Sequence, residues 1–597
     1  MRPKGFLLLA VALAPVHAET DPGIRAAVTR SLPLVERSAA AFVAKRACVS
    51  CHHNILPIFL LHMARGRGFT VDASVLDAVE QKTFRQLHGP AALETAVEAA
   101  TLNDPTPDDS FLLMAAHAAG IPADAATGTY AHRLVHWQRD GHWVTSDFRP
   151  PHSSSVFTAS ATAVRAIHLY LPPELKAEGE QAMAQARLWF SRTPPTSTED
   201  AAFRLLGLVW AGAGPRLIES ARRDLLHLER PGGGWGELPG YPEDAYSTGE
   251  SLFALHEAGM PANASEWQRG TQYLLHTQAA DGSWRVHTRM VSPANVSPEY
   301  FTTGFPYEKD EYLSYAATCW AVMALLSALP ETAPPEALPS SADPTPPWIH
   351  TALFGSASEL RRLLDAGLDP NAKTAGGAAL LMLAAPDAEK VRILIARGAD
   401  VKARTSTGTD ALTIAAAYRG TADSIRALLA AGAEAQRPAG IKVRSSPLVF
   451  ASMTGDLENV RLLLAAGADP ARAAGGNTPL TAALTFGYAD VSEALVAAGA
   501  SAHITETSGI NLLHWAAITN RPQVIPLLVK AGVPLNATDE NGFTPLMYAA
   551  TLDFGDTAVL EGLLRAGADK SIRNAEGRTA REQARYYGHA RIAAALR

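Results

Sequence analysis

The chain has 597 residues, too many for one hydrophobic core, so two or more domains are expected. Hydrophobic residues make up 47%, and 40 prolines and 45 glycines predict a globular protein with many turns rather than a disordered chain. The formal net charge is -7 and no long basic tract occurs, which argues against nucleic-acid binding because a phosphate backbone needs clustered cations.

Residues 1–18 have the pattern of a secretory signal peptide. Arg2 and Lys4 supply the positive start, residues 6–16 are apolar, and residues 16–18 end in a small-residue cleavage pattern. The apolar run is too short to span a bilayer, and no later run is long enough, so no membrane span is expected. We therefore expect an exported protein, located in the periplasm or secreted.

Cys48, Cys51 and His52 form a C-x-x-C-H motif, and His53 follows directly. This is the attachment signature of c-type haem, in which two thiols bond to the vinyl groups and the adjacent imidazole binds the iron. The motif predicts haem c as a cofactor, with His52 as the proximal ligand of the iron. Two other interpretations stay open: a disulfide between Cys48 and Cys51, and a metal site that uses the two thiols with His52 and His53.

The second axial ligand of such a haem is not fixed by the sequence. If one helix runs from Cys51 to Met63, Met63 lies about 16 Å from His52 along the helix axis and cannot reach the same iron. The position is either open or filled by one of several later histidines: His88, His117, His132, His136, His142 or His168.

Between residues 19 and 329, helical stretches alternate with turns that contain glycine and tryptophan. The clearest copy reads QAADGSW at 278–284, and weaker copies end at Trp143 and include Trp235, so the tryptophans are 92 and 49 residues apart. These motifs resemble the QW motif of the squalene cyclase and prenyltransferase family. The resemblance implies an α/α-toroid, a closed ring of helical hairpins, over residues 19–329.

The resemblance does not carry a cyclase activity to this chain. Terpene cyclases use a D-x-D-D motif, but Asp108-Asp109 lacks the aspartate two positions before Asp108. The D-x-C and histidine zinc set of protein prenyltransferases is also missing. Asp244 and Asp310, with Tyr307 near the latter, are candidate residues for the toroid cavity, where two carboxyl groups could act as acid and base. Carboxylates that only cap helices are the alternative.

Residues 330–347 read PETAPPEALPSSADPTPP, which predicts a semi-rigid proline-rich linker. After the linker, a residue pair ending in glycine recurs every 31 to 35 residues, from Gly367 to Gly567. T-P-L occurs at 478–480 and 544–546. This period and signature resemble ankyrin repeats, which implies an ankyrin solenoid over residues 348–597.

The sequence thus predicts an all-α chain, with a terpenoid cyclase-like α/α-toroid followed by an ankyrin-repeat solenoid. The leading hypothesis is an exported scaffold that binds a protein partner on the concave ankyrin face and carries haem c, without terpene cyclase activity. One alternative is an enzyme acting on an apolar, isoprenoid-like ligand in the toroid cavity. Another is a protein-binding scaffold stapled by a Cys48–Cys51 disulfide. Convergent carboxylates in an aromatic pocket would favour the enzyme.

Overall fold

The computed structural model describes residues 22–89, 91–99, 104–152, 154–289, 302–332, 345–436, 446–474 and 476–597. All regular elements within these ranges are helices, connected by turns and a few isolated bridges. None of the helices in these ranges has both the length and the apolar character that crossing a bilayer requires. The expected signal peptide and most of the expected linker lie outside the described residues.

A series of helices in the N-terminal half makes up an inner layer. Each of them contacts the next along the chain, and the last contacts the first, so the contacts close into a ring. These ring helices are α2 (Leu56–Gly66), α5 (Pro105–Ala118), α7 (Val156–Tyr170), α9 (Thr198–Trp210), α11 (Ala245–Glu257) and α13 (Glu311–Ser327).

An outer layer packs against the ring helices. The helix α6 contacts α5 and α7, α8 contacts α7 and α9, and α10, α12 and α1 lie against α9, α11 and α13 in turn. The outer helices are α1 (Pro22–Lys45), α6 (Ala125–Trp137), α8 (Lys176–Arg192), α10 (Pro215–Leu226) and α12 (Ser265–Thr277). Two shorter helices extend this layer, α3 (Ala73–Thr83) against α1 and α4 (Ala92–Val97) against α6.

The three tryptophans of the repeated motif, Trp143, Trp235 and Trp284, join the two layers in the same way. Each indole N–H donates to a carbonyl oxygen in the preceding outer helix, at 2.7 to 2.9 Å: those of Leu134, Leu225 and Leu274. Each backbone N–H donates to a hydroxyl in a ring helix, at 2.9 to 3.2 Å: those of Ser160, Thr248 and Thr318. The motif therefore fixes an outer helix to the inner layer at three places.

The glycine of each motif lies in a turn where the backbone is left-handed, with φ of +84° at Gly141, +89° at Gly233 and +90° at Gly282. Glycine adopts this conformation without the steric cost that a Cβ brings. A Cβ at Gly282 would lie 2.4 Å from the carbonyl oxygen of Arg30 in α1. The last motif thus packs closely against the first helix, which is a second contact that closes the ring.

The C-terminal half is an array of helix pairs. The first helices of the pairs are α14 (Pro347–Leu353), α16 (Leu380–Leu383), α18 (Ala411–Ala416), α20 (Pro447–Thr454), α22 (Pro479–Phe486), α24 (Leu512–Ile518), α26 (Pro545–Thr551) and α28 (Ala580–Tyr586). The second helices are α15 (Ala357–Asp365), α17 (Ala388–Ala396), α19 (Ala422–Ala430), α21 (Leu457–Ala465), α23 (Ala489–Ala497), α25 (Ile525–Lys530), α27 (Ala558–Arg565) and α29 (Ala590–Ala595). Thr478 and Thr544 cap α22 and α26 through their side chains, and a proline follows each in the first turn.

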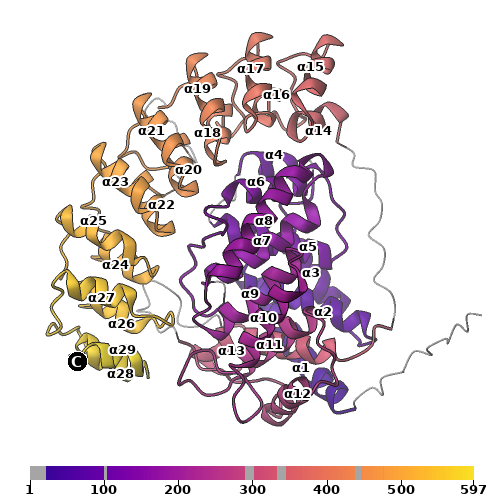
Figure 1. Cartoon of the computed structure of the whole chain (residues 1–597), viewed down its shortest axis with the longest axis vertical. Helices are drawn as coiled ribbons and strands as arrows, with labels where there is room; N and C mark the ends of the chain where they lie inside the picture. Colours follow the sequence, from indigo (N-terminus) through magenta and orange to yellow (C-terminus); the bar gives the residue numbers. More distant parts are fainter. Residues whose placement is uncertain are drawn as a thin grey trace, which may run out of the picture.

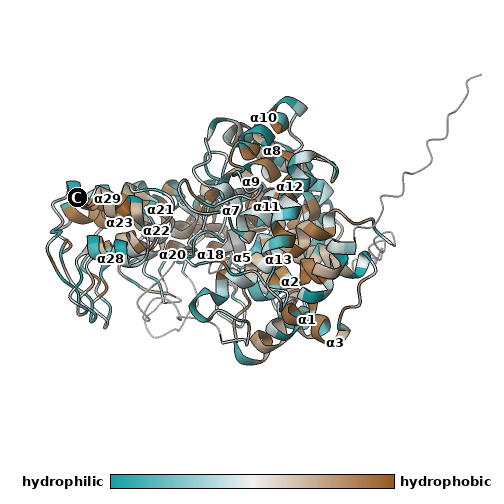
Figure 2. Cartoon of the chain, turned by 90° about the horizontal axis from the view of Figure 1, so that it is seen from below, coloured by the Kyte–Doolittle hydropathy of each residue, from teal (hydrophilic) through white to brown (hydrophobic). Residues whose placement is uncertain are grey.

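The two halves pack against each other along the length of the array, which arches around the ring half (Figure 1). The indole of Trp137 donates to Ala417 O at 2.9 Å, and Arg139 pairs with Asp490 at 2.8 Å. Further along, the Tyr241 hydroxyl donates to the Asp553 carboxylate at 2.8 Å. Figure 2, turned by 90°, shows the array extending from one side of the ring half.

This packing determines what lies against the concave face of the array. The first helices of the pairs, which form the concave face, lie on the side of the arch that faces the ring half (Figure 1). The concave face was expected to bind a separate protein, but in this structure its occupant is the chain's own N-terminal half. The second helices, from α15 to α27, lie on the opposite side of the arch.

Candidate functional site

A cavity of about 860 Å³ lies between the carboxyl halves of the ring helices. Every one of the six helices contributes lining side chains, such as Phe59 from α2, Phe111 from α5, Leu169 from α7, Trp210 from α9 and Trp320 from α13. The cavity is therefore central to the ring and not a groove on one side of it.

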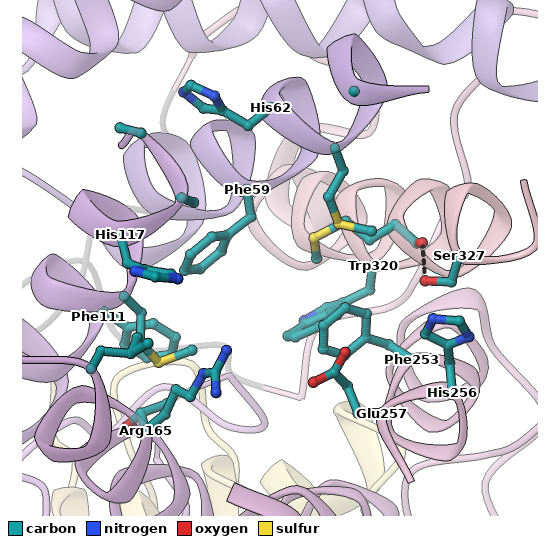
Figure 3. A pocket seen from close by; sticks show the side chains of 18 of the residues that line it. Phe59, His62, Phe111, His117, Arg165, Phe253, His256, Glu257, Trp320 and Ser327 are labelled. Atoms are coloured by element: carbon teal, nitrogen blue, oxygen red, sulfur yellow. Dashed lines mark hydrogen bonds between the residues drawn. The ribbon is translucent and has the colours of Figure 1, made fainter. Parts of the chain in front are cut away.

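The lining combines aromatic and thioether side chains with charged and polar ones (Figure 3). Phe253 and Phe203 lie near Trp320, with ring centroids 5.5 and 6.3 Å away. The remaining apolar lining includes Phe59, Phe111, Met63, Met114 and Met323, and polar lining groups include His62, Arg65, Arg67, His117, Arg165, His256, Glu257 and Glu331. Such a chamber suits an apolar body with one polar end.

A layer of buried polar groups lies below the floor of the cavity, toward the amino ends of the ring helices. Glu250 precedes the floor residue Phe253 by three positions on α11, and Glu199 precedes Phe203 by four on α9. Residues at these spacings share one helix face, about one 5.4 Å turn apart. Both carboxyl groups therefore lie on the inward face of the ring, one turn below the apolar lining.

Hydrogen bonds connect most of this layer. Glu199 accepts from the Thr158 hydroxyl at 2.5 Å and from the Tyr246 hydroxyl at 3.0 Å, and Tyr246 also contacts His152 Nδ1 at 3.2 Å. Glu250 is different, since its side chain is fully buried and neither carboxyl oxygen has a hydrogen-bond partner of ordinary geometry among the described residues.

A third carboxyl group, that of Glu237, belongs to the same layer. It accepts from the Ser247 hydroxyl at 3.3 Å and pairs with Arg289 at 3.4 Å. Arg289 in turn donates to the carbonyl oxygen of Asp553 in the C-terminal array at 3.0 Å. The carboxyl layer is therefore connected to the interface between the two halves.

Burial raises the pKa of these carboxyl groups. The pKa of Glu250 lies well above its usual value, because burial disfavours the anion and the charges of Glu199 and Glu237 add to this effect. Burial also raises the pKa of Glu199 well above its usual value and that of Glu237 to about 8. Burial therefore favours the protonated form of Glu250 and Glu199, while the Arg289 guanidinium opposes the rise in the pKa of Glu237.

The cavity candidates taken from the sequence lie elsewhere. Asp244 caps the amino end of α11, accepting from Ser247 N at 2.8 Å. Asp310 pairs with Arg285 at 3.0 Å, and the Tyr307 hydroxyl bonds to Ser283 at 2.7 Å. All three lie at the amino ends of ring helices, and none of them lines the cavity at the carboxyl ends. The helix-capping alternative describes Asp244 directly.

The C-x-x-C-H motif precedes α2. Cys48 is exposed and Cys51 is partly buried, and no disulfide joins these two described residues. Residues Cys51–Ile55 form a short π-helical turn, capped by the Ser50 hydroxyl, which accepts from His53 N at 3.0 Å. The motif thus begins a ring helix instead of forming a separate small domain.

The surroundings of His52 do not fit a haem. Its ring is 1% exposed and lies between aromatic side chains, with centroids 4.8 Å from Tyr312 and 5.9 Å from Phe42. His53 stacks on Phe42 and on Tyr315, at 4.9 and 3.9 Å. A covalent haem needs both thiols and the imidazole to face one open space, whereas here Cys48 faces solvent and His52 the aromatic core.

The later histidines are dispersed. His117 lines the cavity, His142 stacks on Trp189 at 5.0 Å, and His132 and His136 lie together on α6. His53 and, more weakly, His152 contribute to the lowered pKa of His52, and the sequence did not single out His152. Burial lowers the pKa of both His52 and His152, the latter to about 4, so both rings are neutral at neutral pH.

Comparison with known proteins identifies the C-terminal half. Ankyrin-repeat family models match residues 448–496 and 491–574. The curated protein "Palmitoyltransferase Hip14" of Drosophila melanogaster is 38% identical over 84 residues, which cover 14% of this chain and 13% of that protein. "Protein phosphatase 1 regulatory subunit 27" of Mus musculus is 36% identical over 70 residues, or 12% of this chain and 44% of that protein.

The chain spans less than half the length of each of these curated relatives. Among solved structures, the human ASB11 ankyrin repeat domain covers 36% of this chain and 97% of its own, at 24% identity and a TM-score of 0.32. The family models therefore establish ankyrin repeats in the C-terminal half, which indicate a protein-interaction scaffold.

Proposed function

We propose that the N-terminal half is an α/α-toroid that binds an elongated, apolar, isoprenoid-like molecule in its central cavity, held against an ankyrin scaffold. The observation that carries this proposal is the aromatic cavity to which all six ring helices contribute. The order of the ring contacts and the repeated tryptophan motif support the toroid assignment. A separate protein partner would bind the ankyrin array on the face formed by the second helices.

The size and chemistry of the cavity support this ligand class. A volume of about 860 Å³ lies within the range of small-molecule sites, which is roughly 300 to 1,000 Å³. Phe253 and Trp320 offer apolar contact, while Arg165 lies over the Trp210 ring at 5.7 Å and projects into the chamber (Figure 3). A ligand with a hydroxyl or carboxylate end would place that end near Arg165 and His117.

Titration of the full chain with farnesol and, separately, palmitate tests this proposal. We expect saturable one-to-one binding, seen by native mass spectrometry and by quenching of Trp210 and Trp320 fluorescence. Phe253→Glu places a charge in the cavity and is expected to weaken binding at least about tenfold. Leu188→Glu, on an exposed part of α8, is the matched control and should bind as the wild type does. Equal affinity in both variants would contradict the proposal.

A second candidate function is acid catalysis on the bound ligand. The observation that favours it is the buried carboxyl layer one turn below the cavity floor, in which burial raises the pKa of Glu250 and neither of its carboxyl oxygens has a hydrogen-bond partner of ordinary geometry among the described residues. Protonation of an alkene needs an acid that keeps its proton at neutral pH in an apolar site. For this, the alkene end of the ligand would have to reach past Phe253 to Glu250, which does not line the cavity itself. Glu250 would then give its proton to an alkene carbon, and the resulting carbocation would return a proton to the carboxylate and restore the alkene. The Glu250→Gln variant argued in the Discussion tests this candidate.

Haem c at Cys48, Cys51 and His52 is a proposal from the motif, whereas the packing of His52 predicts a protein without haem. An absorbance spectrum of the chain, expressed with a working haem-attachment system, decides between them. Covalent haem gives a Soret band that survives denaturation and disappears in Cys48→Ala/Cys51→Ala, whereas the observed packing gives a colourless protein.

Export is likewise a proposal from residues 1–18, and the mass of the mature chain tests it.

A further inference from the structure

A group of three side chains on the outer layer lies apart from the cavity and the carboxyl layer. His132 and His136 are four residues apart on α6, so they share one helix face. Glu178, in the first turn of α8, meets them from the neighbouring helix. The three ligand atoms lie within 4.8 Å of one another.

The distances within this group match a zinc coordination sphere. The two Nε2 atoms are 3.2 Å apart, and Glu178 Oε2 lies 3.4 Å from His132 Nε2 and 3.7 Å from His136 Nε2. Zinc bonds of about 2.0 to 2.2 Å at tetrahedral angles place ligand atoms roughly 3.3 to 3.5 Å apart. An ion would fit between the three atoms with shifts of a few tenths of an ångström.

A backbone carbonyl from the other half of the chain orients one of these ligands. His136 Nδ1 lies 2.8 Å from Arg419 O, which accepts the Nδ1 proton and leaves the Nε2 lone pair directed at the group. Metal-binding histidines usually have such a partner on the second ring nitrogen. The Tyr418 ring covers both imidazoles, with centroids 5.6 and 5.2 Å away.

We propose that His132, His136 and Glu178 bind one Zn²⁺ ion at the interface between the ring half and the ankyrin array. Glu178 is about half exposed, so a water molecule completes the tetrahedron from the solvent side. Lys390, the cation near Glu178, is itself held by Ala352 O at 3.1 Å. Since Arg419 and Tyr418 belong to the array, zinc binding and docking of the array stabilise each other.

The test uses the full chain after treatment with a chelator. Zn²⁺ is titrated in competition with a chromophoric chelator, and Co²⁺ is added separately to record the visible absorption of a tetrahedral site. We expect one ion per chain and a rise in melting temperature with Zn²⁺. His132→Gln and His136→Gln should each weaken Zn²⁺ binding at least about 100-fold and remove the rise in melting temperature.

A matched control comes from a neighbouring histidine. His350 lies 3.8 Å from Glu174 but has no place in the group of three, so His350→Gln should bind Zn²⁺ as the wild type does. Circular dichroism of the metal-free variants shows whether they are folded. Wild-type protein that binds no Zn²⁺ against the competitor would overturn the proposal. So would folded His132→Gln and His136→Gln variants that bind Zn²⁺ with wild-type affinity.

Discussion

Replacing Arg133 by alanine is expected to destabilise the protein by about 3 to 5 kcal/mol, because it leaves a buried carboxylate without its cation. Arg133 is 1% exposed and donates from Nε and Nη2 to one oxygen of Asp109, at 3.0 and 2.6 Å. Its Nη1 donates to Ala96 O at 2.7 Å, which connects α6 to α4. Burial raises the pKa of Asp109 and Arg133 opposes this rise, so the pair is interdependent.

Urea unfolding at neutral pH measures this cost. Arg269→Ala is the control, because Arg269 makes a similar pair with Glu229 at 2.6 Å but is half exposed, where such pairs contribute less than about 1 kcal/mol. The double variant Arg133→Met/Asp109→Leu removes both charges and should recover most of the lost stability. A loss in Arg133→Ala no larger than in Arg269→Ala would show that the buried pair does not behave as described.

Much of the fold was predictable because its signals are local. The tryptophan motif requires Gly282 in a left-handed turn and Trp284 against the preceding helix, and both are found there. The ankyrin period likewise follows from residues that the backbone demands, such as Thr544 at a helix start. These signals depend on neighbours within a few positions, so a single sequence displays them.

The candidate site was not predictable in the same way. Glu199, Glu237 and Glu250 come from three separate segments and meet only when the ring closes. A weak signal was present, since Glu250 and Glu199 interrupt the apolar faces of α11 and α9 one turn before a phenylalanine. The docking of the array on the N-terminal half leaves no local pattern in the sequence either, because Trp137 donates to Ala417, which is 280 residues away along the chain.

The C-x-x-C-H motif is evident in the sequence, whereas the surroundings of its histidine are not. The spacing of Cys48, Cys51 and His52 is that of a haem attachment site, but spacing says nothing about what surrounds the imidazole. Here Phe42 of α1 and Tyr312 of α13 fill the space around His52, and neither residue belongs to the π-helical turn. The environment and not the motif decides what such a residue can bind.

Glu250→Gln is expected to stabilise the protein above neutral pH and to reduce the pH dependence of its stability. Glutamine imitates the protonated carboxyl group of Glu250. The pKa of the Glu250 carboxyl group is higher in the folded state than in the unfolded state. Its contribution to the stability of the folded protein is therefore complete below the unfolded-state pKa and is lost as pH rises through the folded-state pKa. Between these two pKa values, the free energy of unfolding falls by about 1.4 kcal/mol per pH unit, because the folded state keeps one proton that the unfolded state has lost.

Urea unfolding of wild type and variant at pH 5, 6.5 and 8 tests this argument, with the exposed Glu389→Gln as control. The free energies of unfolding of the wild type and of Glu250→Gln should depend on pH in the same way near pH 5 and diverge toward pH 8. Only the wild type must then either ionise a buried carboxyl group or keep its proton. Parallel curves would mean that Glu250 is ionised in the folded protein.

The same variant separates the two candidate functions: Glu250→Gln should still bind farnesol, but only the wild type should transfer deuterium from heavy water to the alkene carbons of farnesol. Equal deuterium transfer in both proteins would exclude Glu250 as the acid and leave the cavity as a binding site.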